Sequence, residues 1–166
     1  MRMDLIQPFI NSADAVLAQG LESPVSIENL SMEEEAYRRK GVAAEVILTG
    51  EIEGRIIFDV DLGASLQLAS RLAGVEVSET DEDLVREAVL ELANQIIGNA
   101  VTALNDQGFH FHVRPPVLHT SERGSKSSED TEALVMSFNT SSGKVFMNVA
   151  LRHHCRPAAD QAAVAG

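Results

Sequence analysis

Hydrophobic and polar positions alternate along this chain with two periods, and the helical period is found in three stretches. Apolar residues recur at helical spacing from Asp4 to Gln19, and Gly20 is suited to end this first helix in the left-handed conformation. A second helix is expected after Asp61, whose carboxylate can cap it, and Gly74 then ends it. Two amphipathic helices are therefore expected in the first half of the chain.

The longest helical pattern lies between Thr80 and Gly108. Thr80 and Asp83 resemble a capping box, Gly108 supplies a stop, and the interval allows about seven turns at ~3.6 residues each. On a helical wheel the apolar residues form one broad stripe, which must face the core. The stripe consists of Val85, Val89, Leu92, Ala93, Ile96, Ala100, Ala103 and Leu104. The residues opposite the stripe are therefore expected at the surface.

The patterns typical of strands are found in shorter stretches around these helices. Strands are expected over residues 25–30, 42–49, 55–60, 109–113, 132–139 and 144–152. Gly50 and Gly54 suit a hairpin turn between the second and third of these, and residues 140–143 suit a turn between the last two. We expect residues 31–40 to be a solvated connection without chemistry and residues 121–130 to be a mobile loop.

The composition is typical of a small cytoplasmic protein. Its 166 residues are 45% hydrophobic, which suffices for one core, so we expect a single domain over residues 1–155 and a disordered tail over residues 156–166. Its apolar stretches are all shorter than the about 20 residues that cross a bilayer, so we expect no membrane partner and a cytoplasmic location. The net charge of -12 argues against a nucleic-acid partner, because phosphates are bound by clustered lysine and arginine.

One polar face of the longest predicted helix carries the candidate chemistry. Glu87, Glu91, Asn94 and Gly98 lie roughly opposite the apolar stripe, about one turn apart from one another. Polar residues are ordinary on a helix surface, so Glu91 and Asn94 alone indicate little. Gly98 is different, because a glycine in an exposed helical face costs about 1 kcal/mol relative to alanine and gives no packing benefit unless another group comes close to the backbone. The simplest explanation for Gly98 is a docking partner that contacts the backbone of this helix.

The same helix also contains a family signature. The run Ala88–Ala100, A-V-L-E-L-A-N-Q-I-I-G-N-A, followed by Pro115 and Pro116, resembles the signature of the chemotaxis phosphatases CheC, CheX and FliY. The single E-x-x-N motif is most similar to the CheX branch, because the other two branches resemble duplications with two motifs. The resemblance implies an α+β fold, with a mostly antiparallel β-sheet packed with long helices, and a homodimer. It further implies hydrolysis of the aspartyl phosphate of a CheY-type response regulator in two-component signalling.

This resemblance implies a role for each residue of the polar face. Asn94 would hold the attacking water in line with the phosphorus, and Glu91 would pair with a lysine of the receiver domain's active site. Glu87 and Gly98 would belong to the surface on which the phosphorylated receiver docks. The receiver would also supply the Mg²⁺, so we expect no intrinsic cofactor.

Other functions stay open at this point. A non-catalytic module of the same fold could bind a response regulator or a flagellar protein, and a dimeric structural domain could have no receiver partner at all. A metal site in this chain is not expected, because the adjacent residues His153, His154 and Cys155 point in different directions and no acidic partner shows the needed spacing. Phosphate release from a phosphorylated receiver would separate the phosphatase from both alternatives.

Overall fold

The computed structural model describes residues 3–33, 37–119 and 133–153. These residues form three helices and seven strands. In chain order the elements are α1 (Met3–Leu21), β1 (Ser26–Glu33), β2 (Val42–Gly50), β3 (Ile52–Val60), α2 (Leu62–Ala73), α3 (Glu82–Asp106), β4 (Phe111–Val113), β5 (Val117–Leu118), β6 (Ala133–Thr140) and β7 (Gly143–His153). The predicted loop over residues 121–130 and the predicted tail over residues 156–166 lie outside the described residues.

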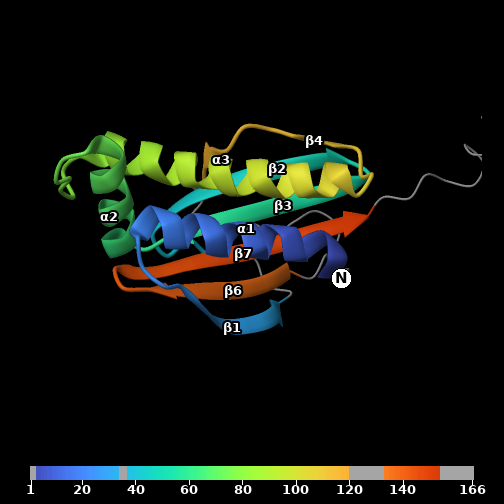
Figure 1. Cartoon of the computed structure of the whole chain (residues 1–166), viewed down its shortest axis with the longest axis horizontal. Coiled ribbons are helices and arrows are strands. Elements are labelled where there is room, and N and C mark those ends of the chain that lie inside the picture. The colour runs from blue at the N-terminus through green and yellow to red at the C-terminus, as the bar shows by residue number, and fades with distance from the viewer. Residues whose placement is uncertain (1–2, 34–36, 120–132, 154–166) are drawn as a thin grey trace, which may run out of the picture.

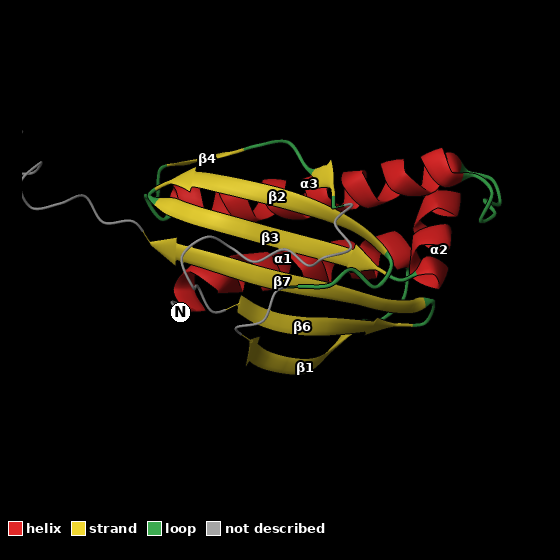
Figure 2. Ribbon diagram, turned by 180° about the vertical axis from the view of Figure 1, so that it is seen from behind, coloured by secondary structure: helices red, strands yellow, loops and turns green. Residues whose placement is uncertain are grey.

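The seven strands form one sheet, and all three helices lie on the same side of it. The strand order is β1-β6-β7-β3-β2-β4, with β5 also paired to β2, and every pairing among the described strands is antiparallel. Helices α1 and α3 run along one face of the sheet while α2 crosses its end (Figure 1). Seen from behind, the sheet lies in front of the helices (Figure 2). The prediction of an α+β fold with a mostly antiparallel sheet and long helices is confirmed.

The core lies between the helices and the sheet, and α3 contributes its whole apolar stripe to it. Seven of the eight predicted stripe residues are buried, and the eighth, Ala103, is half-buried. Helix α1 packs beside α3, and the buried hydroxyl of Ser12 donates a hydrogen bond of 2.7 Å to the carbonyl oxygen of Ile96. This packing fixes the rotation of α3 and therefore determines which of its residues remain at the surface.

Asp61 and Gly74 begin and end α2 as predicted. Asp61 Oδ1 accepts a hydrogen bond of 3.1 Å from the Ala64 N–H, and Gly74 adopts a left-handed φ of 73°. Asp61 Oδ2 also accepts a hydrogen bond of 2.7 Å from the Lys144 N–H at the start of β7. One carboxylate therefore both caps the helix and joins it to the final hairpin.

The predicted end of α1 at Gly20 was wrong. The helix continues through Gly20 to Leu21, and it is Glu22 that adopts the left-handed conformation, with φ 48°. A Cβ at Gly20 would lie 3.3 Å from Leu68 Cδ2, so the glycine gives room for the close approach of α2. Tertiary packing, which a local stop signal does not include, explains this glycine.

The predicted capping box at the start of α3 was also wrong. The helix begins at Glu82, and its N-cap residue Asp81 makes no side-chain capping bond within the described residues. Its carboxylate instead accepts a hydrogen bond of 3.0 Å from the Ser78 N–H, which closes a turn before the helix. The predicted stop at Gly108 is correct, since this residue has φ 95° and its N–H donates to the Asn105 carbonyl at 2.9 Å.

The prediction that residues 31–40 form a solvated connection was wrong in two respects. Strand β1 extends to Glu33, and Tyr37 is buried with 5% of its surface exposed. The Tyr37 hydroxyl donates a hydrogen bond of 2.5 Å to Asp59 Oδ2, and the Gly41 N–H donates one of 2.7 Å to Oδ1 of the same carboxylate. Burial, and after it the hydrogen bond to Asp59, raise the pKa of Tyr37 above its ordinary value.

Candidate functional site

The structure places Glu87, Glu91, Asn94 and Gly98 together on the exposed face of α3. All four residues are exposed, whereas Leu92 and the other stripe residues between them are buried. Their spacings of four, three and four residues keep them on one side of the helix over about three turns. Because α3 is held on its opposite side by α1 and the sheet, this polar face has a fixed position.

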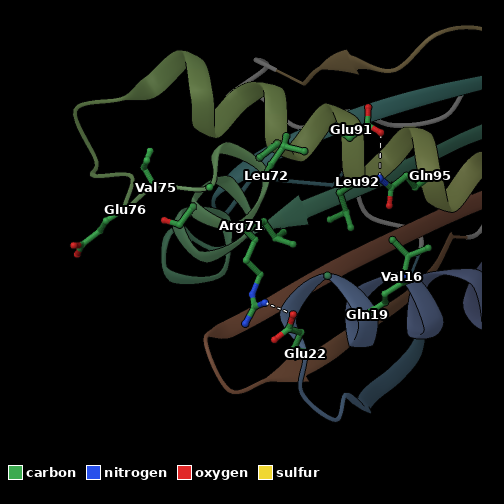
Figure 3. Close-up of a pocket in the computed structure, with 15 residues that line it drawn as sticks. Val16, Gln19, Glu22, Arg71, Leu72, Val75, Glu76, Glu91, Leu92 and Gln95 are labelled. Atoms are coloured by element: carbon green, nitrogen blue, oxygen red, sulfur yellow. Dashed lines mark hydrogen bonds and ion pairs between the residues drawn. The ribbon is translucent and has the colours of Figure 1, made fainter.

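Glu91 is held by a neighbour that the sequence analysis did not single out. Gln95 Nε2 donates a hydrogen bond of 3.1 Å to Glu91 Oε1, one turn further along α3 (Figure 3). The four-residue spacing of Glu91 and Gln95 is the sequence signal that could have identified this pair. The bond orients the Glu91 carboxylate in the absence of any partner.

Gly98 has open space where a side chain would stand, and its carbonyl oxygen accepts a hydrogen bond of 3.0 Å from Thr102 Oγ1. Among the described residues, no atom lies within 4 Å of the position that a Cβ at Gly98 would take, apart from the neighbouring backbone of its own helix. Packing within the described chain therefore gives no reason for a glycine here, in contrast to Gly20. Alanine at this position would stabilise the helix by about 1 kcal/mol more than glycine. A contact between the backbone and another molecule is a physical reason for glycine to stand here instead.

A groove of about 680 Å³ lies directly beside Glu91. Its walls are the end of α1, the end of α2 with residues 74–76, and the middle of α3, where Glu91, Leu92 and Gln95 take part (Figure 3). Because three separate segments of the chain build it, sequence patterns did not predict this groove. Glu91 thus belongs both to the polar face and to the lining of this groove.

The histidines within the described residues do not form a metal centre. No group of three or more histidine, cysteine, aspartate or glutamate side chains there could hold a metal ion. His119 is buried, and its Nδ1 lies 3.0 Å from Glu45 Oε2, on β2. His153 packs its ring edge-on against Phe109, with 5.6 Å between the ring centroids. The surroundings of these two histidines are those of structural side chains.

A family profile and one solved structure place this chain in a single family. The sequence profile of the chemotaxis phosphatase CheX matches residues 42–139, which include α3 and more than half of the chain. The crystal structure of the CheX–CheY–BeF₃–Mg²⁺ complex from Borrelia burgdorferi contains a chain with 31% identity, and the match covers 92% of this chain and 100% of that chain with a TM-score of 0.70. No curated protein is similar to this chain at a significant level.

Two further solved structures share the fold at lower identity. A CheC-like superfamily protein from Shewanella sp. PV-4 is 20% identical, over 92% of this chain and 99% of that chain, with a TM-score of 0.79. The chemotaxis protein CheX from Vibrio vulnificus is 20% identical, over 90% of this chain and 99% of that chain, with a TM-score of 0.76. At this identity the likeness concerns the fold alone.

Proposed function

Because this chain belongs to the chemotaxis phosphatase CheX family, we propose that it removes the phosphoryl group from a CheY-type receiver domain through Glu91 and Asn94. The family match confirms the prediction of a chemotaxis phosphatase, which is a hydrolase. The main support for these two roles is that both side chains are exposed on one face of α3, next to the open space at Gly98.

Asn94 has the properties needed to position a water molecule. Phosphoryl transfer requires mainly positioning and electrostatic stabilisation, and a side-chain amide that orients the attacking water is one recurring solution. The carbonyl oxygen of Asn94 can accept a hydrogen bond from the water while its amide nitrogen donates another. The water then attacks the phosphorus, the bond to the receiver's aspartate breaks, and the products are the free carboxylate and inorganic phosphate.

Glu91 has the charge and position to anchor the receiver. Its carboxylate is exposed and already oriented by Gln95, so it can form an ion pair with a lysine beside the phosphorylated aspartate. Docking would exclude water from this pair, which strengthens it relative to an exposed one. Glu87 and Gly98 extend the docking face by about one turn on either side.

In this proposal the Mg²⁺ ion is part of the substrate. The structure of the Borrelia complex contains CheY, BeF₃ and Mg²⁺ together with CheX. The proposal assigns Glu91 to a lysine of the receiver and Asn94 to the attacking water, and it uses neither residue as a metal ligand. The receiver would bring the ion that neutralises the phosphoryl oxygens.

The proposal also includes a homodimer and a cytoplasmic location. The first follows from the family resemblance, and light scattering of the purified chain would test it. The second follows from the composition of the chain. None of the described helices has both the length and the apolar character needed to cross a bilayer.

The decay of a phosphorylated receiver tests the proposal. The wild-type chain should accelerate phosphate release, and Asn94→Ala should lower kcat by about a hundredfold while KM changes little. Asn99→Ala is the matched control, because Asn99 is also exposed on α3 but lies outside the polar face. Equal rates for Asn94→Ala and the wild type would exclude the role of Asn94. Binding without hydrolysis by the wild type would instead support the alternative, a non-catalytic module.

A further inference from the structure

The groove beside Glu91 exposes apolar side chains to an unusual degree. Val75 and Leu72, 64% and 58% exposed, are the two most exposed large hydrophobic side chains among the described residues. Both belong to the lining of this one groove, to which Glu91 also contributes. Figure 3 shows them on the α2 side of the groove, with Leu72 drawn between Val75 and Glu91. Such side chains gathered beside a candidate active site are typical of an interaction surface.

Charge adds a second property to this groove. The residues that line it include three glutamates, Glu22, Glu76 and Glu91, and one arginine, Arg71. Arg71 Nη1 lies 2.9 Å from Glu22 Oε1, so this cation already has an acidic partner. Glu76 and Glu91 therefore give the residues around the groove an excess of negative charge beside the apolar side chains of Leu72 and Val75.

We propose that this groove is a recognition surface for the receiver domain, and that it binds an apolar side chain of the receiver that has a lysine or arginine beside it. The inference rests on the proposed function. Its main support is continuity, because Glu91 lines the groove and also stands on the polar face with Asn94. A receiver whose phosphoryl group reaches Asn94 covers the adjoining groove, where Leu72 and Val75 would lose their exposure to water.

The apolar contact is tested by serine substitutions at the groove and at a matched position. Val75→Ser and Leu72→Ser should each raise KM for the phosphorylated receiver by about five- to tenfold, as expected for loss of an apolar anchor, with kcat unchanged. Val117→Ser is the control, because Val117 is 57% exposed and lies on β5, outside the groove. Thermal unfolding of each variant separates weaker docking from loss of the fold.

A charge reversal at Glu76 tests the contribution of negative charge to receiver binding, independently of the apolar contact. Glu76→Lys should weaken binding of a receiver loaded with BeF₃⁻ and Mg²⁺, and the loss should diminish at high salt. Glu79→Lys is its control, since Glu79 is exposed in the same connection but does not line the groove.

The two proposals fail in different ways. If the wild type hydrolyses the phosphorylated receiver but the groove variants match Val117→Ser in KM and Glu79→Lys in binding, the groove is not a recognition surface and the proposed function stands. If the wild type has no activity, the proposed function is wrong and the groove assignment falls with it. A raised KM in Val75→Ser and Leu72→Ser with unchanged kcat, together with weaker binding by Glu76→Lys, supports the groove.

Discussion

Gln95 Nε2 donates a hydrogen bond of 3.1 Å to Glu91 Oε1 across one turn of α3. This bond restricts the Glu91 carboxylate before any receiver arrives. Gln95→Ala should lower kcat/KM by about two- to fivefold, because a hydrogen bond of this kind contributes roughly 0.5–1 kcal/mol. Gln95→Lys should lower kcat/KM further, because a lysine four residues after a glutamate pairs with it and competes with the lysine of the receiver. Steady-state kinetics with a phosphorylated receiver measure both effects. Full activity in Gln95→Lys would contradict the role of Glu91 as an ion-pair partner.

Substitutions at Gly98 should affect the stability of α3 and its use as a docking surface in different ways. Gly98→Ala should raise the free energy of unfolding by up to about 1 kcal/mol, because an added Cβ meets no neighbouring atom and alanine favours a helix. Gly98→Leu should also fold but should lower kcat/KM, because its side chain projects where the receiver approaches. Urea unfolding and phosphate release are measured on the same variants. Asn99→Leu controls for added bulk on the exposed surface of α3, and equal activity of both leucine variants would exclude a close contact at Gly98.

The candidate face could be predicted from the sequence because it depends on one helix alone. The helical period defines the apolar stripe, and the stripe in turn defines the opposite face, so Glu91 and Asn94 could be placed at the surface without knowledge of any other element. The Gln95 contact lies within the same period and could also have been found. Local periodicity was therefore sufficient to place these residues at the surface, whereas their choice as candidate catalytic residues came from the resemblance to the family.

The groove and the buried polar contacts could not be predicted, because they depend on segments distant in the sequence. Leu72 shares the helical period of the α2 core residues, and only the position of α2 at the end of the sheet leaves it exposed. Tyr37 lies in a charge-rich stretch, and its burial depends on packing with Ala43 on β2 and Ile57 on β3, where its hydroxyl also finds Asp59. Gly20 was mistaken for a helix stop because its contact with Leu68 is not visible in the local pattern.

Because Tyr37 is buried in its protonated form, we expect the protein to lose stability at alkaline pH. Its pKa in the folded protein is raised, chiefly by burial, so the unfolded chain releases this proton more readily. The contribution to stability is fully present below the unfolded pKa of about 10 and is lost as the pH rises above it. Urea unfolding at a series of pH values should show this decline, and it should be smaller in Tyr37→Phe.

The ionisation of Tyr37 can also be measured directly by absorbance, because Tyr37 is the only tyrosine and the chain has no tryptophan. The near-ultraviolet absorbance of tyrosinate should therefore appear in the native protein only together with unfolding. Tyrosinate that forms at its ordinary pKa in the folded protein would show that Tyr37 is accessible and not held by Asp59.

Asp61 and Asp81, which precede α2 and α3, should differ in how much they contribute to the free energy of unfolding. Asp61→Ala removes the acceptors of the Ala64 and Lys144 N–H groups, at 3.1 and 2.7 Å, and should lower the free energy of unfolding by about 2 kcal/mol. Asp81→Ala should cost less, because Asp81 makes no capping bond within the described residues and its carboxylate contacts the exposed Ser78 turn. Urea unfolding of both variants measures the difference, and phosphate release under native conditions should stay near the wild-type rate because both changes lie away from Glu91 and Asn94. Equal losses of stability in the two variants would show that the hydrogen bonds of Asp61, including the one that joins α2 to β7, contribute no more than those of an exposed carboxylate.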